Sequence, residues 1–340
     1  MTQKSKKSSP DSKKSKNCYV YPPINVPRKW CQLSYAGTER VPPAEDPSAG
    51  TWPTYFMNNN RGKFTDVNGN PIAFQIRVPD SSIDFEGRQL KIVIDTLNNI
   101  TDRQICIAKY WGTGPATKQW TPIIDILIDT YNITAPRASR ILAATQAALN
   151  DAFVVSWYFK YLWNIARPDQ FDQHLATILC TPYHPTYPSG HATVAGCAQM
   201  VLSYFFQSES RRLKELAEQC AISRLYAGVH FPIDNEEGLR LGRQIGKIAV
   251  SVLQQQEDGG QAQIDYPITI NRHAPLPPPP YTQVIPFKGN TKCNSLIINT
   301  DHVDCSHING CKCVCKQSEP ESEVDSNCDE PCCNECDNNE

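Results

Sequence analysis

Three short motifs between residues 157 and 234 constrain this chain more than any other feature of its sequence. The first is Lys160-x6-Arg167-Pro168. Seven residues make nearly two turns of a helix, so Lys160 and Arg167 project from nearly the same face. Pro168 ends the helix, because the residue before a proline is pushed out of the helical region. The motif therefore predicts a helix that offers two cations to one bulky anion.

The second motif, Pro188-Ser189-Gly190-His191, predicts the start of a helix. Pro188 suits the first turn of a helix, and Gly190 allows backbone N–H groups to approach an oxygen atom closely. Such a helix start is an anion-binding site.

The third motif carries Arg224, His230 and Asp234. Gly228 and Pro232 allow a break in the helix, so Arg224 and His230 can point to one place. Asp234 falls in the first turn of the following helix, where a carboxylate can fix the tautomer of His230 and raise its basicity. Each motif alone also fits a solvated helix face, a turn or a surface pair. The three in this order predict a pocket for a tetrahedral oxyanion.

Taken together, the motifs resemble those of the type 2 phosphatidic acid phosphatase superfamily, which holds metal-free acid phosphatases and vanadium-dependent haloperoxidases. Longer runs are similar to the haloperoxidase branch: Asp151-Ala152-x4-Trp157-x2-Lys160, Tyr187 to Thr193, and His230-Phe231-Pro232-x-Asp234-x3-Gly238. The similarity extends over about residues 84–256. It implies an all-α helical bundle of the vanadium haloperoxidase and acid phosphatase type, with an irregular N-terminal wrap and extended tails.

Apolar periodicity also predicts an all-α bundle, because seven or eight helical segments with little strand follow one another over residues 83–256. We interpret this range as the catalytic bundle. The expected helices include 135–166, 171–179, one opened by Pro188, 210–226 and 233–256.

The segments outside the bundle differ from it in composition. Residues 18–82 are rich in proline and predict an irregular wrap with one small hairpin that turns at Asn68-Gly69. The remaining segments are a disordered basic tail over 1–17, a Pro-rich extension over 257–300 and a Cys-rich acidic tail over 301–340.

Nine of the 15 cysteines follow residue 290. Their spacing, for example Cys311-x-Cys313-x-Cys315, fits either binding of a soft metal or disulfide crosslinking. The six earlier cysteines, including Cys180, Cys197 and Cys220, are predicted to be buried reduced thiols in apolar helices.

The overall balance of charge and hydropathy excludes two classes of function. A formal net charge of −2 gives no general basic field, so nucleic acid is not an expected partner. No apolar run approaches the roughly 20 residues that a membrane-spanning helix needs. The Lys-rich start lacks the apolar stretch of a secretory signal, so we expect a cytoplasmic protein by default, with a coat or extracellular location as the alternative.

The resemblance to haloperoxidases implies vanadate as the cofactor, with no haem and no flavin. His230 would be the single protein ligand of vanadium, and His191 the acid–base group for hydrogen peroxide. The resemblance implies that the vanadate oxygens are bound by Lys160, Arg167, Arg224, Ser189 and the N–H of Gly190. The expected partners are hydrogen peroxide, a halide and a diffusible organic acceptor; a homo-oligomer is also expected as a possibility.

Two aromatic positions bear on the halide. In the haloperoxidase family a tryptophan at the position of Trp157 lines the halide side of the pocket, and a core aromatic is the alternative interpretation. His184 stands where bromide-oxidising members carry histidine and chloride-oxidising fungal members carry phenylalanine. The resemblance therefore implies bromide or iodide rather than chloride.

The same residues fit a second enzyme class. In a soluble, metal-free acid phosphatase His230 would attack phosphorus to give a phosphohistidine, Asp234 would orient it, and His191 would protonate the leaving oxygen. Lys160 and the arginines would stabilise the charge of the transition state. A third hypothesis is a structural or coat-associated protein, crosslinked through its Cys-rich tail.

Overall fold

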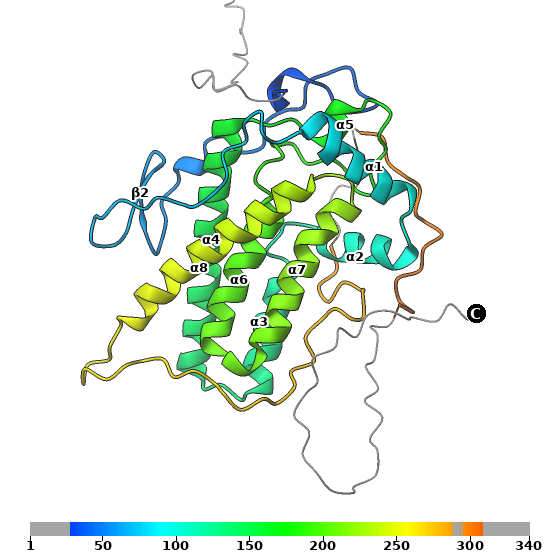
Figure 1. Cartoon of the computed structure of the whole chain (residues 1–340). Helices are drawn as coiled ribbons and strands as arrows, with labels where there is room; N and C mark the ends of the chain where they lie inside the picture. Colours follow the sequence, from blue (N-terminus) through cyan, green and yellow to red (C-terminus); the bar gives the residue numbers. More distant parts are fainter. Residues whose placement is uncertain (1–27, 288–292, 294, 309–340) are drawn as a thin grey trace, which may run out of the picture.

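The chain folds into an all-α bundle, as predicted (Figure 1). The computed structural model describes residues 28–287, 293 and 295–308. The α-helices of this part are α1 Leu90–Asn98, α2 Asp102–Gly112, α3 Trp120–Thr130, α4 Ala135–Trp163, α5 Pro168–Phe171, α6 Gly190–Phe205, α7 Ser210–Tyr226 and α8 Pro232–Gln254. Short 3-10 helices span Trp30–Gln32, Ala49–Thr51 and Gln207–Glu209, and a π-helical turn spans Phe85–Gln89.

Helix α6 forms the centre of the bundle, and α4, α7 and α8 pack around it (Figure 1). The closest approach is between α6 and α8. A Cβ atom at Gly242 would lie 1.9 Å from the carbonyl oxygen of Thr193, and one at Gly196 would lie 2.6 Å from that of Leu239. Glycines at these two positions therefore allow the two backbones to touch. This contact fixes the start of α8 against the start of α6, where the second and third motifs meet.

Helix α4 has a clear start and stop. Pro136 lies in its first turn, and Asn164 ends it in the left-handed conformation with φ of 55°. The helix ends at Trp163, three residues before the predicted end at Ala166. The turn that follows sends Arg167 back toward the same end of the bundle as Lys160.

The predicted helix over 171–179 is wrong. Helix α5 ends at Phe171, and the chain beyond it runs without helix to Ser189. The backbone of Thr177 instead bonds to both Leu296 and Ile298, with N···O distances of 3.0 and 2.8 Å. Pairing with a distant segment therefore overrides the local helical pattern.

The N-terminal segment wraps over α4 and carries a small hairpin, but the paired strands differ from those predicted. Strands β1 Asn58–Asn60 and β2 Lys63–Thr65 form an antiparallel pair around Arg61-Gly62. The predicted turn at Asn68-Gly69 follows as a second turn, closed by a single bridge between Thr65 and Pro71. It is not the turn of the regular hairpin.

Buried Asp151 on α4 anchors this segment to the bundle. Its carboxylate accepts the backbone N–H groups of Tyr55 at 2.9 Å and Phe56 at 2.8 Å. Because one buried carboxylate pairs with two backbone donors of this segment, Asp151 has a structural role.

The prediction of reduced thiols is wrong for Cys180, which lies in an extended segment and forms a disulfide with Cys293. Cys106 on α2 forms another with Cys305, and Cys31 is disulfide-bonded as well. Cys197 and Cys220 are free and buried, as predicted. The two disulfides fasten Cys293 and Cys305 to the bundle.

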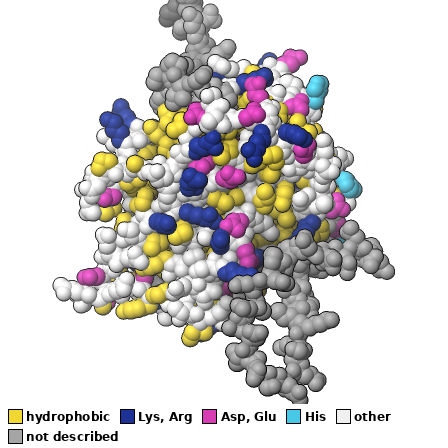
Figure 2. Space-filling model, in the orientation of Figure 1, with side chains coloured by type: hydrophobic (Ala, Val, Ile, Leu, Met, Phe, Trp, Pro, Cys, Tyr) yellow, Lys and Arg dark blue, Asp and Glu magenta, His cyan; other side chains and the backbone are white. Residues whose placement is uncertain are grey.

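Parts of the predicted tails lie outside the described residues, namely all of 1–17 and the cysteines from Cys311 onward. Within the described part, no group of three or more His, Cys, Asp or Glu side chains could hold a metal ion. None of the described helices is long and apolar enough to cross a membrane. Figure 2 shows acidic and basic side chains interspersed over one face, in keeping with the small net charge.

Candidate active site

The three motifs meet at one end of the bundle. The C-terminal half of α4 supplies Trp157 and Lys160, and Arg167 immediately precedes α5. Ser189, Gly190 and His191 lie at the start of α6, and Arg224 lies in the last turn of α7. The α7–α8 connection supplies His230, and the first turn of α8 supplies Asp234. Six of these side chains are at most 2% exposed: Lys160, Arg167, Ser189, Arg224, His230 and Asp234.

Asp234 orients the ring of His230. Its Oδ2 lies 2.9 Å from Nδ1 of His230, and the same oxygen accepts the backbone N–H of Phe231 at 2.9 Å and the hydroxyl of Thr186. An ionised carboxylate here makes Nδ1–H the donor and leaves the lone pair on Nε2. Burial and the nearby cations Arg167 and Lys160 hold the pKa of His230 well below its usual value, so the ring is neutral.

Arg167 lies on the Nε2 side of that ring. Its Nη1 donates to Nε2 of His230 at 3.1 Å and to the carbonyl of Val229 at 2.7 Å. Its Nε donates to the carbonyl of His184 at 3.0 Å, and Nη2 lies 3.0 Å from Nδ1 of that residue. The guanidinium is thus held in one orientation between the two histidines.

Lys160 and Ser189 make structural contacts as well. The ammonium group of Lys160 donates to the carbonyl oxygens of Pro185 at 2.8 Å and Thr186 at 2.9 Å. The hydroxyl of Ser189 caps α6 by accepting the N–H of Ala192 at 3.4 Å. At Gly190 a Cβ atom would lie 3.3 Å from the Trp157 ring, so a side chain would crowd this end of the site.

At the site, Arg224, His191 and Asp234 each hold buried side-chain polar atoms that lack a hydrogen-bond partner within the described structure; in Asp234 this atom is Oδ1. Nε and Nη1 of Arg224 and Nε2 of His191 are buried and make no hydrogen bond there. The backbone of Trp111 bonds to the His191 ring, and a Cβ atom at the adjacent Gly112 would lie 2.6 Å from Nη1 of Arg224. Buried, unpaired donors of a cation are costly unless an acceptor meets them, so this arrangement suits an anion.

The net charge of the cluster also favours an anion. Lys160, Arg167 and Arg224 bring three buried positive charges, and Asp234 brings one negative charge. Burial lowers the pKa of all three cations, to about 10 for Arg224. Burial also raises the pKa of Asp234 to about 6, although Lys160 and Arg167 oppose that rise. The cluster can therefore neutralise the charge of an oxyanion.

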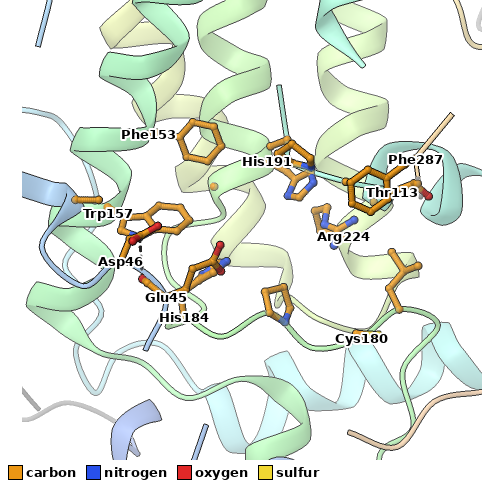
Figure 3. A pocket seen from close by; sticks show the side chains of 18 of the residues that line it. Glu45, Asp46, Thr113, Phe153, Trp157, Cys180, His184, His191, Arg224 and Phe287 are labelled. Carbon is orange, nitrogen blue, oxygen red and sulfur yellow. Dashed lines mark hydrogen bonds between the residues drawn. The ribbon is translucent and has the colours of Figure 1, made fainter. Parts of the chain in front are cut away.

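A cavity of about 600 Å³ lies beside this cluster (Figure 3). Trp157, His184, Gly190, His191 and Arg224 line it on the side of the cluster. The ring centroids of Trp157 and His184 lie 4.6 Å apart. Lys160, Arg167, Ser189, His230 and Asp234 do not contribute to the lining, so the structure places them behind it.

Several residues of the site carried no recognisable signal in the sequence. Thr186 bonds to Asp234, and Glu45 and Asp46 enter the cavity from the N-terminal segment (Figure 3). Glu45 has a raised pKa, first because of burial and then because of Asp46. For Thr186 the sequence offers one local sign, its position two residues before Pro188 of the second motif. The acidic pair lies over 100 residues from the motifs in sequence and belongs to none of them.

Comparisons with known proteins identify relatives of this chain. The profile of the PAP2 superfamily matches residues 141–258, a range that includes all three motifs. Decaprenylphosphoryl-5-phosphoribose phosphatase from Mycobacterium tuberculosis is 31% identical over 121 residues, covering 35% of this chain and 66% of that protein.

Haloperoxidases are also similar. Vanadium-dependent bromoperoxidase from Corallina pilulifera is 33% identical over 103 residues, covering 22% of this chain but 17% of that protein. The chain therefore matches less than a fifth of the bromoperoxidase. The crystal structure of a bacterial vanadium-dependent iodoperoxidase superposes with a TM-score of 0.52 at 25% identity, covering 64% of this chain and 60% of that chain. Residues 141–258 form a PAP2 superfamily domain, and vanadium haloperoxidases are among the relatives of this chain.

Proposed function

We propose that the protein is a vanadium-dependent haloperoxidase that uses hydrogen peroxide to oxidise a halide to hypohalous acid. The observation that carries this proposal is the pair of unpaired, buried Arg224 donors beside a neutral histidine whose Nε2 carries a lone pair. The relatives named above support the same chemistry, since two of them are vanadium haloperoxidases.

The residues fit vanadate on several counts. Nε2 of His230 is the proposed ligand atom, because Asp234 holds the proton on Nδ1. The donors of Arg224 and Arg167 and the ammonium of Lys160 would bind the oxygens through charge-assisted hydrogen bonds. The N–H of Gly190 at the start of α6 is proposed to bind there too. Bound vanadate would supply Lewis-acid activation of hydrogen peroxide.

His191 is the proposed acid–base group. Its Nε2 lines the space beside Arg224 and has no partner among the described residues, while the backbone of Trp111 bonds to the ring. Burial and the nearby Arg224 keep the pKa of His191 well below its usual value. A neutral imidazole is ready to accept a proton from hydrogen peroxide at neutral pH.

Bromide and iodide are the proposed halides. The Trp157 and His184 rings form one wall of the cavity at a centroid distance of 4.6 Å, and His184 is neutral because burial lowers its pKa. A large, polarisable anion fits beside this aromatic wall better than a small, strongly hydrated one.

A metal-free phosphatase is the second candidate, because phosphate fits the same donors and a phosphatase is among the relatives. His230 would attack phosphorus while Asp234 holds its ring, and His191 would protonate the leaving oxygen. The nucleophile would again be Nε2 of His230. The two functions thus share one site and differ in which oxyanion occupies it.

The other expectations stay predictions. We propose residues 83–256 as the catalytic bundle. A homo-oligomer and a structural, coat-associated role are untested. For location, the disulfides Cys180–Cys293 and Cys106–Cys305 favour an oxidising compartment or a coat over the cytoplasm expected by default.

Paired assays on one phosphate-free, chelator-treated preparation test the function. Bromination of a dimedone-type acceptor with peroxide and bromide, and hydrolysis of an aryl phosphate, are each measured before and after orthovanadate is added. The proposal requires vanadate to switch on bromination at micromolar concentration. An efficient esterase that vanadate only inhibits would make the protein a phosphatase instead.

A further inference from the structure

The cavity beside the oxyanion cluster is larger than the small reactants of the proposed reaction require. Its volume of about 600 Å³ lies within the range of roughly 300–1,000 Å³ that is usual for organic ligands. Much of its lining is apolar, including Trp52, Phe153, Val154, Leu179 and Phe287. Hydrogen peroxide and a halide ion at the Trp157 and His184 wall leave the rest of this apolar lining unused. It fits an organic molecule with an apolar body.

Exposed apolar side chains belong to this lining. Trp52, Phe287 and Ile297 are 47%, 45% and 51% exposed, and all three line the cavity. They come from segments far apart in the sequence. Clustered exposed apolar surface usually marks a binding site, because water contact with it is unfavourable.

Two carboxylates enter the same cavity from a fixed loop. The N–H of Glu45 donates to the carbonyl of Tyr183 at 2.8 Å. Its own carbonyl accepts Nε1 of Trp157 at 3.3 Å and the hydroxyl of Tyr161 at 2.6 Å. Asp46 has φ of 39°, in the left-handed region of backbone conformation. Residues other than glycine rarely adopt it, and those that do are often found at functional sites. The backbone of this loop is therefore fixed to the bundle where both carboxylates branch from it.

The cavity thus has two polar regions that differ in charge. Glu45 and Asp46 lie beside Trp157 and His184, whereas Arg224 and His191 lie further along the cavity (Figure 3). Arg224 is 2% exposed, and its Nε and Nη1 have no partner among the described residues, so that region suits the oxyanion. The acidic pair attracts a cationic group.

We propose that the cavity binds an organic acceptor that has an aromatic or other apolar body and a cationic ammonium group. The ammonium group lies at Glu45 and Asp46, and the body lies along Phe153, Leu179 and Phe287. This inference rests on the proposed haloperoxidase function, because the acceptor receives the oxidised halogen.

The reaction balances with the reactants already named. Hydrogen peroxide, bromide and a proton give hypobromous acid and water, so bromide loses two electrons and peroxide gains them. Hypobromous acid then replaces an aromatic C–H bond of the acceptor with C–Br. The displaced proton leaves with hydroxide as a second water molecule.

The test uses two phenols with the same ring and opposite charges. The cationic probe is 2-(4-hydroxyphenyl)ethyl-trimethylammonium, whose nitrogen cannot be halogenated, and the anionic probe is 3-(4-hydroxyphenyl)propionate. Calorimetry with the full-length protein, its oxyanion region first filled with orthophosphate, should give at least tenfold tighter binding of the cation. The double variant Glu45→Gln/Asp46→Asn should lose that preference, and each single variant should lose part of it.

A matched control removes two carboxylates elsewhere. Asp125 and Asp129 are exposed on α3 and do not line the cavity, so Asp125→Asn/Asp129→Asn should bind the cation as the unmodified protein does. Equal binding of both probes, or an equal loss of cation binding in the two double variants, overturns the proposal. Circular dichroism of each variant verifies that it is folded.

Competition between the probes separates the acceptor site from the proposed function. The vanadate-loaded protein, given equal amounts of both probes, should brominate the cationic phenol severalfold more often than reagent hypobromous acid does. If the protein brominates the two phenols in the same ratio as reagent hypobromous acid does, the haloperoxidase function stands and the acceptor site is refuted. If the cavity binds the cationic phenol selectively but the protein brominates no acceptor, the haloperoxidase function is refuted and the assignment of a cationic ligand to the cavity stands.

Discussion

Nδ1 of His230 lies 2.9 Å from Oδ2 of Asp234, and both side chains are buried at the start of α8. The same carboxylate oxygen also accepts the N–H of Phe231, which fixes its position beside the ring. This bond decides which nitrogen of His230 faces the cations. The protonation state of Asp234 therefore controls the proposed ligand atom from the other side of the ring.

The affinity for orthovanadate should fall as the pH drops below about 6. The pKa of Asp234 is raised to about 6 by burial, so acidification protonates its carboxyl and removes the acceptor for Nδ1–H. His230 stays neutral here, because burial and the charges of Arg167 and Lys160 lower its pKa. Calorimetry between about pH 5 and 8 measures this fall in affinity. Asp234→Asn should bind orthovanadate about 10–100-fold more weakly, and its affinity should not fall below pH 6. The same fall in the variant would show that another group is responsible.

The stability contribution of the same group should change with pH in the opposite direction. The folded-state pKa of about 6 exceeds the ordinary value of 3.8, so the folded protein holds this proton more tightly. The contribution is fully present below about pH 4 and is lost as the pH rises through 6. Urea unfolding of the vanadate-free protein and of Asp234→Asn, each measured from about pH 4 to above pH 6, gives the contribution of Asp234 as the difference in their free energies of unfolding.

His230→Ala and His191→Ala should separate binding from turnover. Without the ring of His230, tight vanadate binding and both activities should disappear. Without His191, vanadate should still bind while kcat falls by about 10²–10⁴-fold, because a general acid–base group contributes on that order. His174→Ala, at an exposed position, is the control. Full activity of either kind in His230→Ala would refute the site.

Arg224→Met should stabilise the empty protein and weaken oxyanion binding. The buried guanidinium leaves Nε and Nη1 unpaired, so its removal should raise the free energy of unfolding by about 1–3 kcal/mol. Affinity for vanadate and phosphate should fall by on the order of 100-fold. Melting curves with and without phosphate measure both effects. Arg211→Met, at a side chain that is 94% exposed, should change neither.

Asp151→Asn should loosen the N-terminal segment. The variant keeps one carbonyl oxygen for two backbone donors, so we expect a loss of about 1–3 kcal/mol in the free energy of unfolding. Limited proteolysis should then cut near Tyr55 more quickly. Ser139→Ala, at an exposed position on α4, should leave that cleavage rate nearly unchanged.

Removing the disulfide at the cavity should affect the cavity more than the oxyanion cluster. Cys180 and Cys293 both line the cavity, so Cys180→Ser/Cys293→Ser should weaken binding of the cationic phenol. Affinity for orthovanadate should remain within about twofold. Cys106→Ser/Cys305→Ser removes a disulfide away from the lining and should lower stability by about 2–4 kcal/mol with less effect on the phenol. Equal losses of phenol binding in both would show a general unfolding instead.

The sequence predicts the parts of this protein that depend on local patterns. The expected helix over 210–226 coincides with α7, and the motif residues converge at one end of the bundle because each lies at a helix end. Proline and glycine at fixed positions make such ends readable.

Features made by distant partners escape the same analysis. Residues 171–179 carry a helical pattern, yet Thr177 pairs with Leu296 and Ile298 across the bundle. The disulfide partners Cys106 and Cys305 are 199 residues apart in the sequence. Glu45, whose carbonyl accepts Nε1 of Trp157, precedes the hairpin in the sequence, whereas Trp157 follows it. Periodicity describes which face of a segment is apolar, but it does not say which distant segment will cover it.

The cavity wall and the oxyanion cluster come from different stretches of the chain. The motifs between residues 157 and 234 hold the cluster, whereas Glu45, Asp46, Ala49 and Trp52 on one side and Phe287, Cys293 and Ile297 on the other line the cavity. Substitutions in these two outer stretches can therefore alter the shape and charge of the cavity without touching a residue that binds the oxyanion.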